Sequence, residues 1–350
     1  MPQFSIRKLV SLLSSSALIA TFVEASIPAV ASAAVVCTET GFVRDSVNLT
    51  AAQIGGNVTG TLDATGCNIG VYYGPGVSAT VSSADIFGAN YFGIVVRQAI
   101  VNVSNSDVHD IGETPLNGSQ HGIAIYYATI DTGTATTQPN CVPGATSGTI
   151  TGNAIDDYQK AGIVANCAGT VVKIADNVVT GEGAVNYIAQ NGIQIGYGAK
   201  ATVTGNTVSG NAYTGANLAS SGGILVVGGP AYGLPYTTGL SITKNTLTNN
   251  DVGIWLYNAD AAGNAPTTNT NNIVKINTIT NGDVTNTTGF SATCGYQAGI
   301  SDLGHKDVFV NNSIKGVGYT PQAGDCTGTD LAFLRLIDAD SSARVSPSNK

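Results

Sequence analysis

The stretch NGIQIGYGAKATVTGNTVSG, residues 191–210, decides the fold of this chain. It contains a Gly-Ile step followed by alternating apolar residues, and then TGNTV, in which an Asn lies between two short apolar runs. Both signatures recur along the chain, which indicates that each repeat forms one coil of a solenoid. The Gly-Ile steps begin at Gly93, Gly122, Gly162, Gly192, Gly223, Gly253 and Gly299.

Each coil is predicted to hold three short strands. The first carries the Gly-Ile step, as in Gly122–Ile125, the second precedes the repeated Asn, as in Ala201–Thr204, and the third follows it, as in Thr207–Ser209. Because successive side chains of a strand point to opposite faces, every second apolar residue should point inward. The predicted fold class is all-β, a single-stranded parallel β-helix with a cap at each end.

The repeated Asn is predicted to have a structural role. Stacked Asn amides can hydrogen-bond from one coil to the next, and Asn tolerates the left-handed backbone that a tight turn needs. Ser106 occupies the equivalent position one coil earlier, so the ladder should stop there. The members of the predicted Asn ladder are Asn153, Asn177, Asn206, Asn245, Asn277 and Asn312.

Residues 1–33 have the pattern of a signal peptide. Arg7 and Lys8 precede an apolar, Ser-rich run over Leu9–Val23, and Ala31-Ser32-Ala33 fits a cleavage site. The apolar run is shorter than the roughly 20 residues that span a bilayer, which argues against a membrane anchor. We therefore expect a secreted, extracellular protein without membrane insertion.

Residues 34–350 are predicted to form a single domain. A chain of this length often divides into two domains, but a solenoid grows by adding coils, so repeats override that expectation. We expect an N-terminal cap over residues 34–60, coils over residues 61–330, and a C-terminal cap and tail over residues 331–350.

The composition limits the partners of the protein. Only 10% of residues are charged and the net charge is −8, so binding to nucleic acid or to anionic lipid is not expected. Apolar residues make up 43% of the chain and are phased rather than scattered, which excludes a disordered protein. We expect a monomer.

Six Cys follow the predicted signal peptide, which suggests disulfides formed in an oxidising compartment. Sequence alone allows fifteen pairings. Residues one coil apart stack at about 4.8 Å, a Cα separation that a disulfide tolerates. Zinc is the alternative, but no ligand spacing typical of zinc is present. The pairs separated by about one coil are Cys37 with Cys67, Cys141 with Cys167, and Cys294 with Cys326.

The repeats over Gly93–Val317 resemble right-handed parallel β-helix proteins of the pectate-lyase-like superfamily. The runs CNIGVYYGPG (Cys67–Gly76), YQKAGIV (Tyr158–Val164) and QNGIQIGYGA (Gln190–Ala199) are more closely similar to an uncharacterised group of secreted bacterial β-helix proteins. That superfamily contains lyases, glycoside hydrolases, epimerases, esterases, tailspikes and adhesins. The catalytic motifs of its epimerases, polygalacturonases and pectate lyases are absent from this sequence, so the resemblance implies a fold but no reaction.

Acidic residues gather on neighbouring turns. Alignment of the coils places Asp156 and Asp157 one coil from His109-Asp110, and Glu182 on the next coil. Carboxyls this close should raise one another's pKa, so the three acids are candidates for general acid and base or for Ca²⁺ ligands. The competing interpretation is a solvated acidic turn. No other metal or cofactor is predicted.

Lys160 and His121 are candidates for a catalytic base. A lyase must remove the proton α to a uronate carboxyl and stabilise the anion that forms, and either side chain would lie near the predicted acids. The alternative for Lys160 is an ion pair with Asp156 or Asp157. The alternative for His121 is a hydrogen-bonded turn histidine.

The outer face of the first strands carries aromatic and amide side chains. Such a face suits sugar rings, which need an apolar platform and neutral hydrogen-bond partners. Three insertions border this face, over Tyr127–Ser147, Gly228–Thr238 and Asn258–Asn271, and the alternative is that they fold over the aromatics and bury them. The predicted substrate-binding residues are Arg97, Tyr126, Asn166, Gln194, Trp255 and Tyr257.

Two functions fit the sequence. One is an enzyme acting on an extracellular polysaccharide, a lyase or a glycoside hydrolase. The other is a non-catalytic carbohydrate-binding, adhesin-like or structural surface protein. The position of Asp156, Asp157 and Glu182 distinguishes them, because an enzyme needs these acids on the same face as Trp255.

Overall fold

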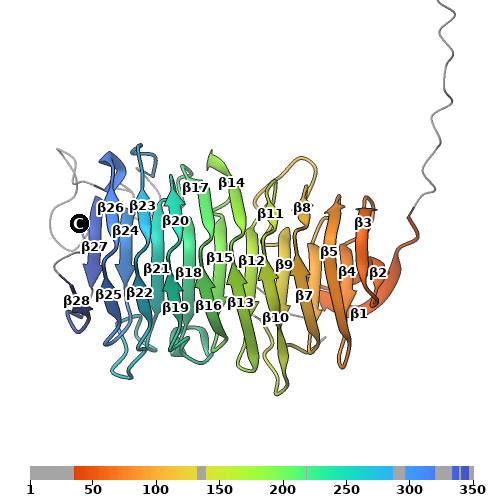
Figure 1. Ribbon diagram of the computed structural model, residues 1–350, viewed down its shortest axis with the longest axis horizontal. Coiled ribbons are helices and arrows are strands. Elements are labelled where there is room, and N and C mark those ends of the chain that lie inside the picture. Colours follow the sequence, from red (N-terminus) through yellow and green to blue (C-terminus); the bar gives the residue numbers. More distant parts are fainter. Residues whose placement is uncertain are drawn as a thin grey trace, which may run out of the picture. The chain divides into compact units, whose positions relative to one another are not determined.

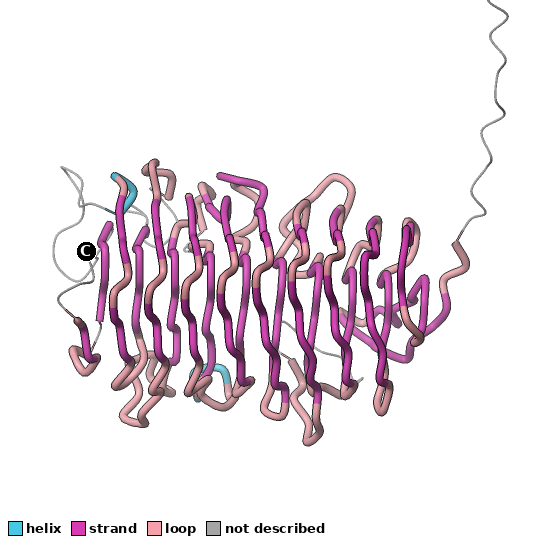
Figure 2. Tube along the Cα trace, in the orientation of Figure 1, coloured by secondary structure: helices cyan, strands magenta, loops and turns pink. Residues whose placement is uncertain are grey.

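The computed structural model describes residues 35–131, 139–217, 219–286, 296–319, 333–338 and 340–346. The predicted signal peptide and the predicted bridge between Cys294 and Cys326 lie outside the described residues. In the described part, strands stack in chain order along one long axis, as Figure 1 shows. Two short 3-10 helices, η1 (Pro230–Tyr232) and η2 (Val317–Tyr319), lie at the edges, and Figure 2 shows loops joining the strands at both edges.

The first strands of the coils form one sheet. It is parallel throughout, except that its first strand pairs antiparallel with its second. In order, its strands are β1 (Thr38–Arg44), β2 (Val47–Ile54), β4 (Ile69–Tyr73), β6 (Phe92–Arg97), β9 (Ile123–Ala128), β12 (Ala161–Asn166), β15 (Asn191–Gly196), β18 (Gly222–Gly228), β21 (Val252–Asn258), β24 (Gln297–Asp302) and β27 (Phe333–Asp338).

The second and third strands share one continuous sheet that bends at the repeated Asn. The second strands are β7 (Ile100–Ser104), β10 (Thr146–Thr151), β13 (Thr170–Ala175), β16 (Lys200–Thr204), β19 (Ser241–Thr243), β22 (Ile273–Lys275), β25 (Val308–Val310) and β28 (Arg344–Val345). The third strands are β3 (Val58–Asp63), β8 (Asp107–His109), β11 (Ala154–Ile155), β14 (Val178–Val185), β17 (Thr207–Tyr213), β20 (Thr246–Thr248), β23 (Thr278–Thr280) and β26 (Ser313–Lys315). The longer β5 (Ser78–Phe87) pairs with both sets. The predicted three-strand coil is confirmed.

The Gly of each Gly-Ile step is required by close contact between coils. A Cβ built on Gly162, Gly192, Gly223 or Gly253 would lie 2.6–2.8 Å from the carbonyl oxygen of the equivalent Gly in the next coil. No side chain fits there, while the Ile that follows fills the core. The stacked core residues are Ile163, Ile193, Ile224, Ile254 and Ile300, all fully buried.

The Asn ladder is confirmed. The Nδ2 of each member donates to the Oδ1 of the next at 2.8–3.0 Å from Asn153 to Asn312, and all six side chains are buried. At the other end, the backbone N–H of Ser106 donates to Asn153 Oδ1 at 3.0 Å, and Ser106 continues no amide stack. The ladder therefore stops at the predicted residue.

The structure moves both predicted cap boundaries. Strand β2 already pairs in parallel with β4, so the first coil begins inside the range 34–60 that we predicted to be a cap. Likewise β27 and β28 pair in parallel with β24 and β25, so a further coil lies within 331–350. The N-terminal end is covered by β1, which turns back on β2.

Two of the three predicted disulfides are present, Cys37–Cys67 and Cys141–Cys167, each with a Cα separation of 5.4 Å. The first ties the segment before β1 to the first coils. The second ties the insertion after β9 to the turn that follows β12. In the part of the chain that the structure describes, no helix has the length and apolar character needed to cross a membrane.

Candidate functional site

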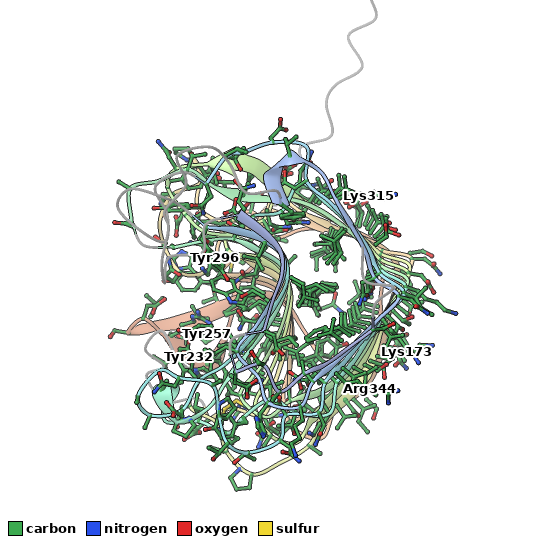
Figure 3. All side chains as sticks on the ribbon, turned by 90° about the vertical axis from the view of Figure 1, so that its left-hand side faces the viewer. Lys173, Tyr232, Tyr257, Tyr296, Lys315 and Arg344 are labelled. Atoms are coloured by element: carbon green, nitrogen blue, oxygen red, sulfur yellow. A yellow bond between two sulfur atoms is a disulfide. The ribbon has the colours of Figure 1, made fainter. Side chains whose placement is uncertain are left out.

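The outer face of the first sheet carries two columns of side chains. Pairing in register places Tyr126, Val164, Gln194, Leu225 and Trp255 in one column. The second column runs through the next outward positions of the same strands: Arg97, Ala128, Asn166, Gly196, Val227 and Tyr257. The six predicted substrate-binding residues therefore do share one face. Figure 3 shows Tyr232, Tyr257 and Tyr296 on this side and Lys173, Lys315 and Arg344 on the opposite side.

The N-terminal half of this face is covered. Phe42 of β1 and Ile130 of the insertion after β9 pack over it in a second hydrophobic cluster outside the helix core. Tyr126 is only 3% exposed and stacks on Phe92 at 5.2 Å between ring centroids. Arg97 is partly buried, and its Nε donates to the Ile130 carbonyl at 2.8 Å. Tyr126 therefore offers no free surface, because Phe42 and Ile130 cover it, whereas Arg97 stays partly exposed with its Nε engaged.

Beyond this covered region the face opens into a cavity of about 240 Å³, which we call the sheet groove. Side chains of both outward columns, of β1 and of two insertions surround it. None of its described lining residues is acidic, and two are cationic. The residues that define it here are Arg44, Lys160, Asn166, Asn191, Gln194, Tyr197 and Tyr232.

Lys160 lies in the sheet groove rather than beside the acids. Its Nζ donates to the Ala189 carbonyl at 2.8 Å, and it forms no ion pair with any described residue. Burial, with a smaller contribution from the charge of Arg44, lowers the pKa of Lys160 to about 8. The alternative of an ion pair with Asp156 or Asp157 is not observed, because buried Tyr158 and Gln159 lie between them in the chain and the backbone turns there into β12.

Amide groups line the middle of the groove. Gln194 Nε2 donates to Asn166 Oδ1 at 3.3 Å, and Asn191 Oδ1 accepts from the Gly222 N–H at 3.2 Å. Gln194 is partly exposed, so it retains hydrogen-bonding capacity toward the groove. These neutral donors and acceptors suit sugar hydroxyls.

An aromatic row extends the groove toward the C-terminal coils. Successive ring centroids lie 5.8, 6.2, 5.6 and 6.0 Å apart along Tyr197, Tyr232, Tyr257, Trp255 and Tyr296. Trp255, Tyr257 and Tyr232 are partly exposed. The alternation of side chains along the strand predicted that Trp255 and Tyr257 point outward. It missed Tyr197, which lies in a turn with φ 58°, and Tyr296, which comes from an insertion, because neither position belongs to the repeat.

Two of the three predicted acids line one cavity, but it is not the sheet groove. Asp157 and Glu182 line a space of about 280 Å³ with Asp110 and Glu113, beneath the loop that contains Pro115. We call it the acidic cavity. Burial and then the neighbouring Asp157, through its charge and a hydrogen bond, raise the pKa of Glu182 to about 7. Burial and the charge of Asp157 also raise the pKa of Asp156.

Stacked turns explain this cluster. Asp110 (φ 50°) and Asp157 (φ 43°) both adopt the left-handed backbone that Asp tolerates, and the Ile111 N–H donates to the Asp157 carbonyl at 2.9 Å. The loop above is anchored by Gln159, whose Oε1 accepts from the N–H groups of Glu113 and Asn117, both at 3.1 Å. Sequence reasoning missed this role of Gln159.

His121 joins neither cavity. Its Nε2 lies 2.7 Å from Glu113 Oε1, its ring stacks on Tyr91 at 3.9 Å, and Nδ1 lies 3.7 Å from Asp45. The alternative of a hydrogen-bonded histidine therefore describes its surroundings. Among the described residues, no group of three or more His, Cys, Asp or Glu side chains is arranged to hold a metal ion.

Comparison with known proteins agrees with this architecture. The sequence matches the family model for a right handed beta helix region over residues 53–230, just over half of the chain. The fold and this match define a right-handed parallel β-helix protein, and the chain belongs to the right-handed β-helix family. No curated protein matches it.

Among solved structures, the chain is similar to the one described as the complex structure of XylC with xylose. The two are 15% identical with a TM-score of 0.42, and the match covers 70% of this chain but only 37% of the other. A likeness at that level indicates no function for this chain.

Proposed function

We propose that this protein is a secreted, monomeric β-helix protein that binds an extracellular polysaccharide in the sheet groove and along the aromatic row. The observation that carries the proposal is the continuity of the two, since Tyr197 and Tyr232 belong to both. The two disulfides suit an oxidising, extracellular compartment.

Binding would combine stacking with hydrogen bonds. Trp255 and Tyr257 offer partly exposed rings on which sugar faces can stack. Partly exposed Gln194 offers its amide to the hydroxyls, and buried Asn166 holds that amide in place. By analogy with other aromatic platforms, each stacked ring contributes on the order of 1–3 kcal/mol. These rings come from strands and short anchored loops, so little conformational entropy is lost when a ligand binds.

The separation of the acids from the aromatic row favours binding over cleavage at this groove. Asp157 and Glu182 line the acidic cavity, whereas Trp255 contacts the rings of Tyr257 and Tyr296 on the outer sheet face. Of the five predicted catalytic residues, only Lys160 lies in the groove. A lyase reaction there would depend on Lys160 as the base.

Hydrolysis in the acidic cavity is the second candidate, and one observation favours it. Glu182 and Asp157 are coupled through a hydrogen bond, and the pKa of Glu182 is raised to about 7. Near neutral pH Glu182 can therefore keep its proton and serve as general acid next to Asp157.

Incubation of the protein with a panel of polysaccharides tests these functions together. Binding by every variant is read from the heat of titration, and binding by proteins that keep Trp255, the chain's only Trp, also from its emission. Cleavage is read from reducing ends and from the absorbance of unsaturated uronates. The proposal expects binding that Trp255→Ala weakens and that Lys173→Met, on the opposite side, leaves unchanged. Reducing ends that disappear in Glu182→Gln would instead establish the hydrolase. Binding unaffected by Trp255→Ala would refute the proposed groove.

A further inference from the structure

The sheet groove is closed at one end. Along a single column of the outer face, Val95, Tyr126 and Val164 are at most 3% exposed, whereas Gln194, Leu225 and Trp255 are partly exposed. These positions follow one another strand by strand, so accessibility changes at the step from β12 to β15.

Two separate segments make the closure. Phe42 and Arg44 come from β1, and Ile130 and Pro139 come from the insertion after β9, and all four line the groove. The Cys141–Cys167 disulfide holds the end of the insertion that follows Pro139, and antiparallel pairing with β2 holds β1. These segments therefore block a polymer that lies along the outer face of the first sheet from extending over the first coils.

Positive charge is concentrated at this closed end. Lys160 has no ionic partner among the described residues, and its Nζ donates a hydrogen bond to the Ala189 carbonyl. Arg44 lies over the Phe92 ring at 5.3 Å and donates through Nη2 to the Gln120 carbonyl at 2.9 Å. Its Nε is buried without a hydrogen-bond partner.

The nearby acids compensate this charge only in part. Asp45 lies 3.8 Å from Arg44 Nε and is 43% exposed, so water screens it, and it also approaches His121. Glu113 is engaged with His121 at 2.7 Å. The chain carries a net charge of −8, yet the described lining of this cavity contains two cationic and no acidic residues.

We propose that the sheet groove receives the end of a saccharide chain and holds an anionic group of the terminal sugar, a carboxylate or a sulfate ester, between Lys160 and Arg44. This inference rests on the proposed function. The guanidinium offers donors matched to a planar or tetrahedral oxyanion, and the ammonium offers a compact charge. Sugars further along the chain then lie on the amides and the aromatic row, which leads away from the closed end.

The proposal predicts proton uptake. With free Lys160 titrating at a pKa of about 8, an anion beside it raises that pKa, so binding at pH 8 takes up as much as roughly half a proton. A neutral sugar produces no such uptake. Calorimetry in two buffers of different ionisation enthalpy measures the number directly.

Four trisaccharides of one β-1,4-glucan backbone provide the test, titrated into the full-length secreted protein. One is neutral, one carries a terminal glucuronate, one carries a terminal 6-sulfate, and one carries a central glucuronate. We expect a terminal charge, at whichever chain end fits, to bind at least about 10-fold more tightly than the central charge or the neutral sugar. The carboxylate and sulfate arms show which anion the pocket prefers.

Variants separate this inference from the proposed function. Lys160→Met should abolish the preference for a terminal charge and the proton uptake, Arg44→Gln should reduce the preference, and Lys173→Met is the matched control on the opposite side. Circular dichroism checks the fold of each. Equal binding of terminal and central glucuronate, or a preference that survives in both Lys160→Met and Arg44→Gln, overturns the inference.

Binding that needs Trp255 but not Lys160 would refute the recognition of an anionic terminal sugar and would still support the proposed function. Binding that needs Lys160 but not Trp255 keeps the anion pocket and rejects the aromatic platform. Absence of binding to all four trisaccharides counts against both.

Discussion

Removal of one rung of the Asn ladder should strongly destabilise the solenoid. Asn206 is fully buried, and its Oδ1 accepts from the backbone N–H of Asn177 at 3.0 Å and from Asn177 Nδ2 at 2.9 Å. Its own Nδ2 donates to Asn245 Oδ1 at 3.0 Å and to the Ile174 carbonyl at 3.1 Å. Asn206→Ala removes the side-chain amide to which all these groups are hydrogen-bonded.

The magnitude follows from the groups left unpaired. Asn245 Oδ1 keeps the backbone N–H of residue 206 at 3.0 Å, so it remains satisfied. The N–H of Asn177 loses its partner outright, and the Asn177 amide and the Ile174 carbonyl lose one bond each. At about 1–3 kcal/mol for each buried unpaired group, Asn206→Ala should lower the free energy of unfolding by about 3–5 kcal/mol.

Urea unfolding followed by circular dichroism measures this loss. Thr207→Ala is the matched control, because Thr207 is exposed on the same turn and its removal should change the unfolding free energy by less than about 0.5 kcal/mol. Ser106→Ala, at the end of the ladder, should cost about 1–2 kcal/mol, since chiefly the Ala84 N–H loses its acceptor. A loss below 1 kcal/mol for Asn206→Ala would show that the ladder contributes little to stability.

Three further predictions concern the site and its supports. Trp255→Ala should weaken saccharide binding by about 1–3 kcal/mol, seen in titrations that follow tyrosine emission or heat. Cys141→Ser combined with Cys167→Ser should lower stability by about 3 kcal/mol and expose Tyr126, as thermal unfolding and tyrosine quenching would report. Burial raises the pKa of Asp251 to about 7, well above its unfolded value of about 3.9, so the folded state keeps a proton that the unfolded chain releases. Wild-type stability should therefore fall by about 3–4 kcal/mol from pH 4 to pH 7 through this group, and Asp251→Asn should remove that slope in urea unfolding at several pH values.

Each of these has a contradicting result. Equal affinity of Trp255→Ala would remove the aromatic row from the binding site. An unchanged unfolding temperature without the Cys141–Cys167 bridge would show that the insertion holds its place by packing alone. An Asp251→Asn variant with the same pH slope as the wild type would assign the slope to other carboxyls.

The fold was predictable because each repeat carries its own contacts. Gly is required in the Gly-Ile step by the adjacent coil, because a side chain on Gly162 would clash with the carbonyl of Gly192. The Asn ladder likewise joins equivalent turns of adjacent coils. In a solenoid each coil makes the same contacts with the next coil, so a periodic sequence is enough to indicate the fold. The same spacing correctly paired Cys37 with Cys67 and Cys141 with Cys167.

For the site, the sequence predicted which residues share a face or lie close together, but not which of them are accessible. Alternation placed Gln194, Trp255 and Tyr257 on the outer face, and coil alignment brought Asp157 near Glu182. Strand β1, by contrast, has no repeat signature, and nothing in its sequence indicates that Phe42 covers the outer face of the first coils.

The sequence by itself therefore determined the coil, its core, its ladder and two of its disulfides. Only the tertiary structure decided which stretch of the outer face is accessible and that Lys160 and Asp157 lie in different cavities. The physical reason is that contacts between coils recur at a fixed spacing, whereas the covering segments depend on single contacts between residues far apart in the chain. Phe42 and Ile130, for example, join one hydrophobic cluster on the outer face from distant parts of the chain, and no periodicity encodes this.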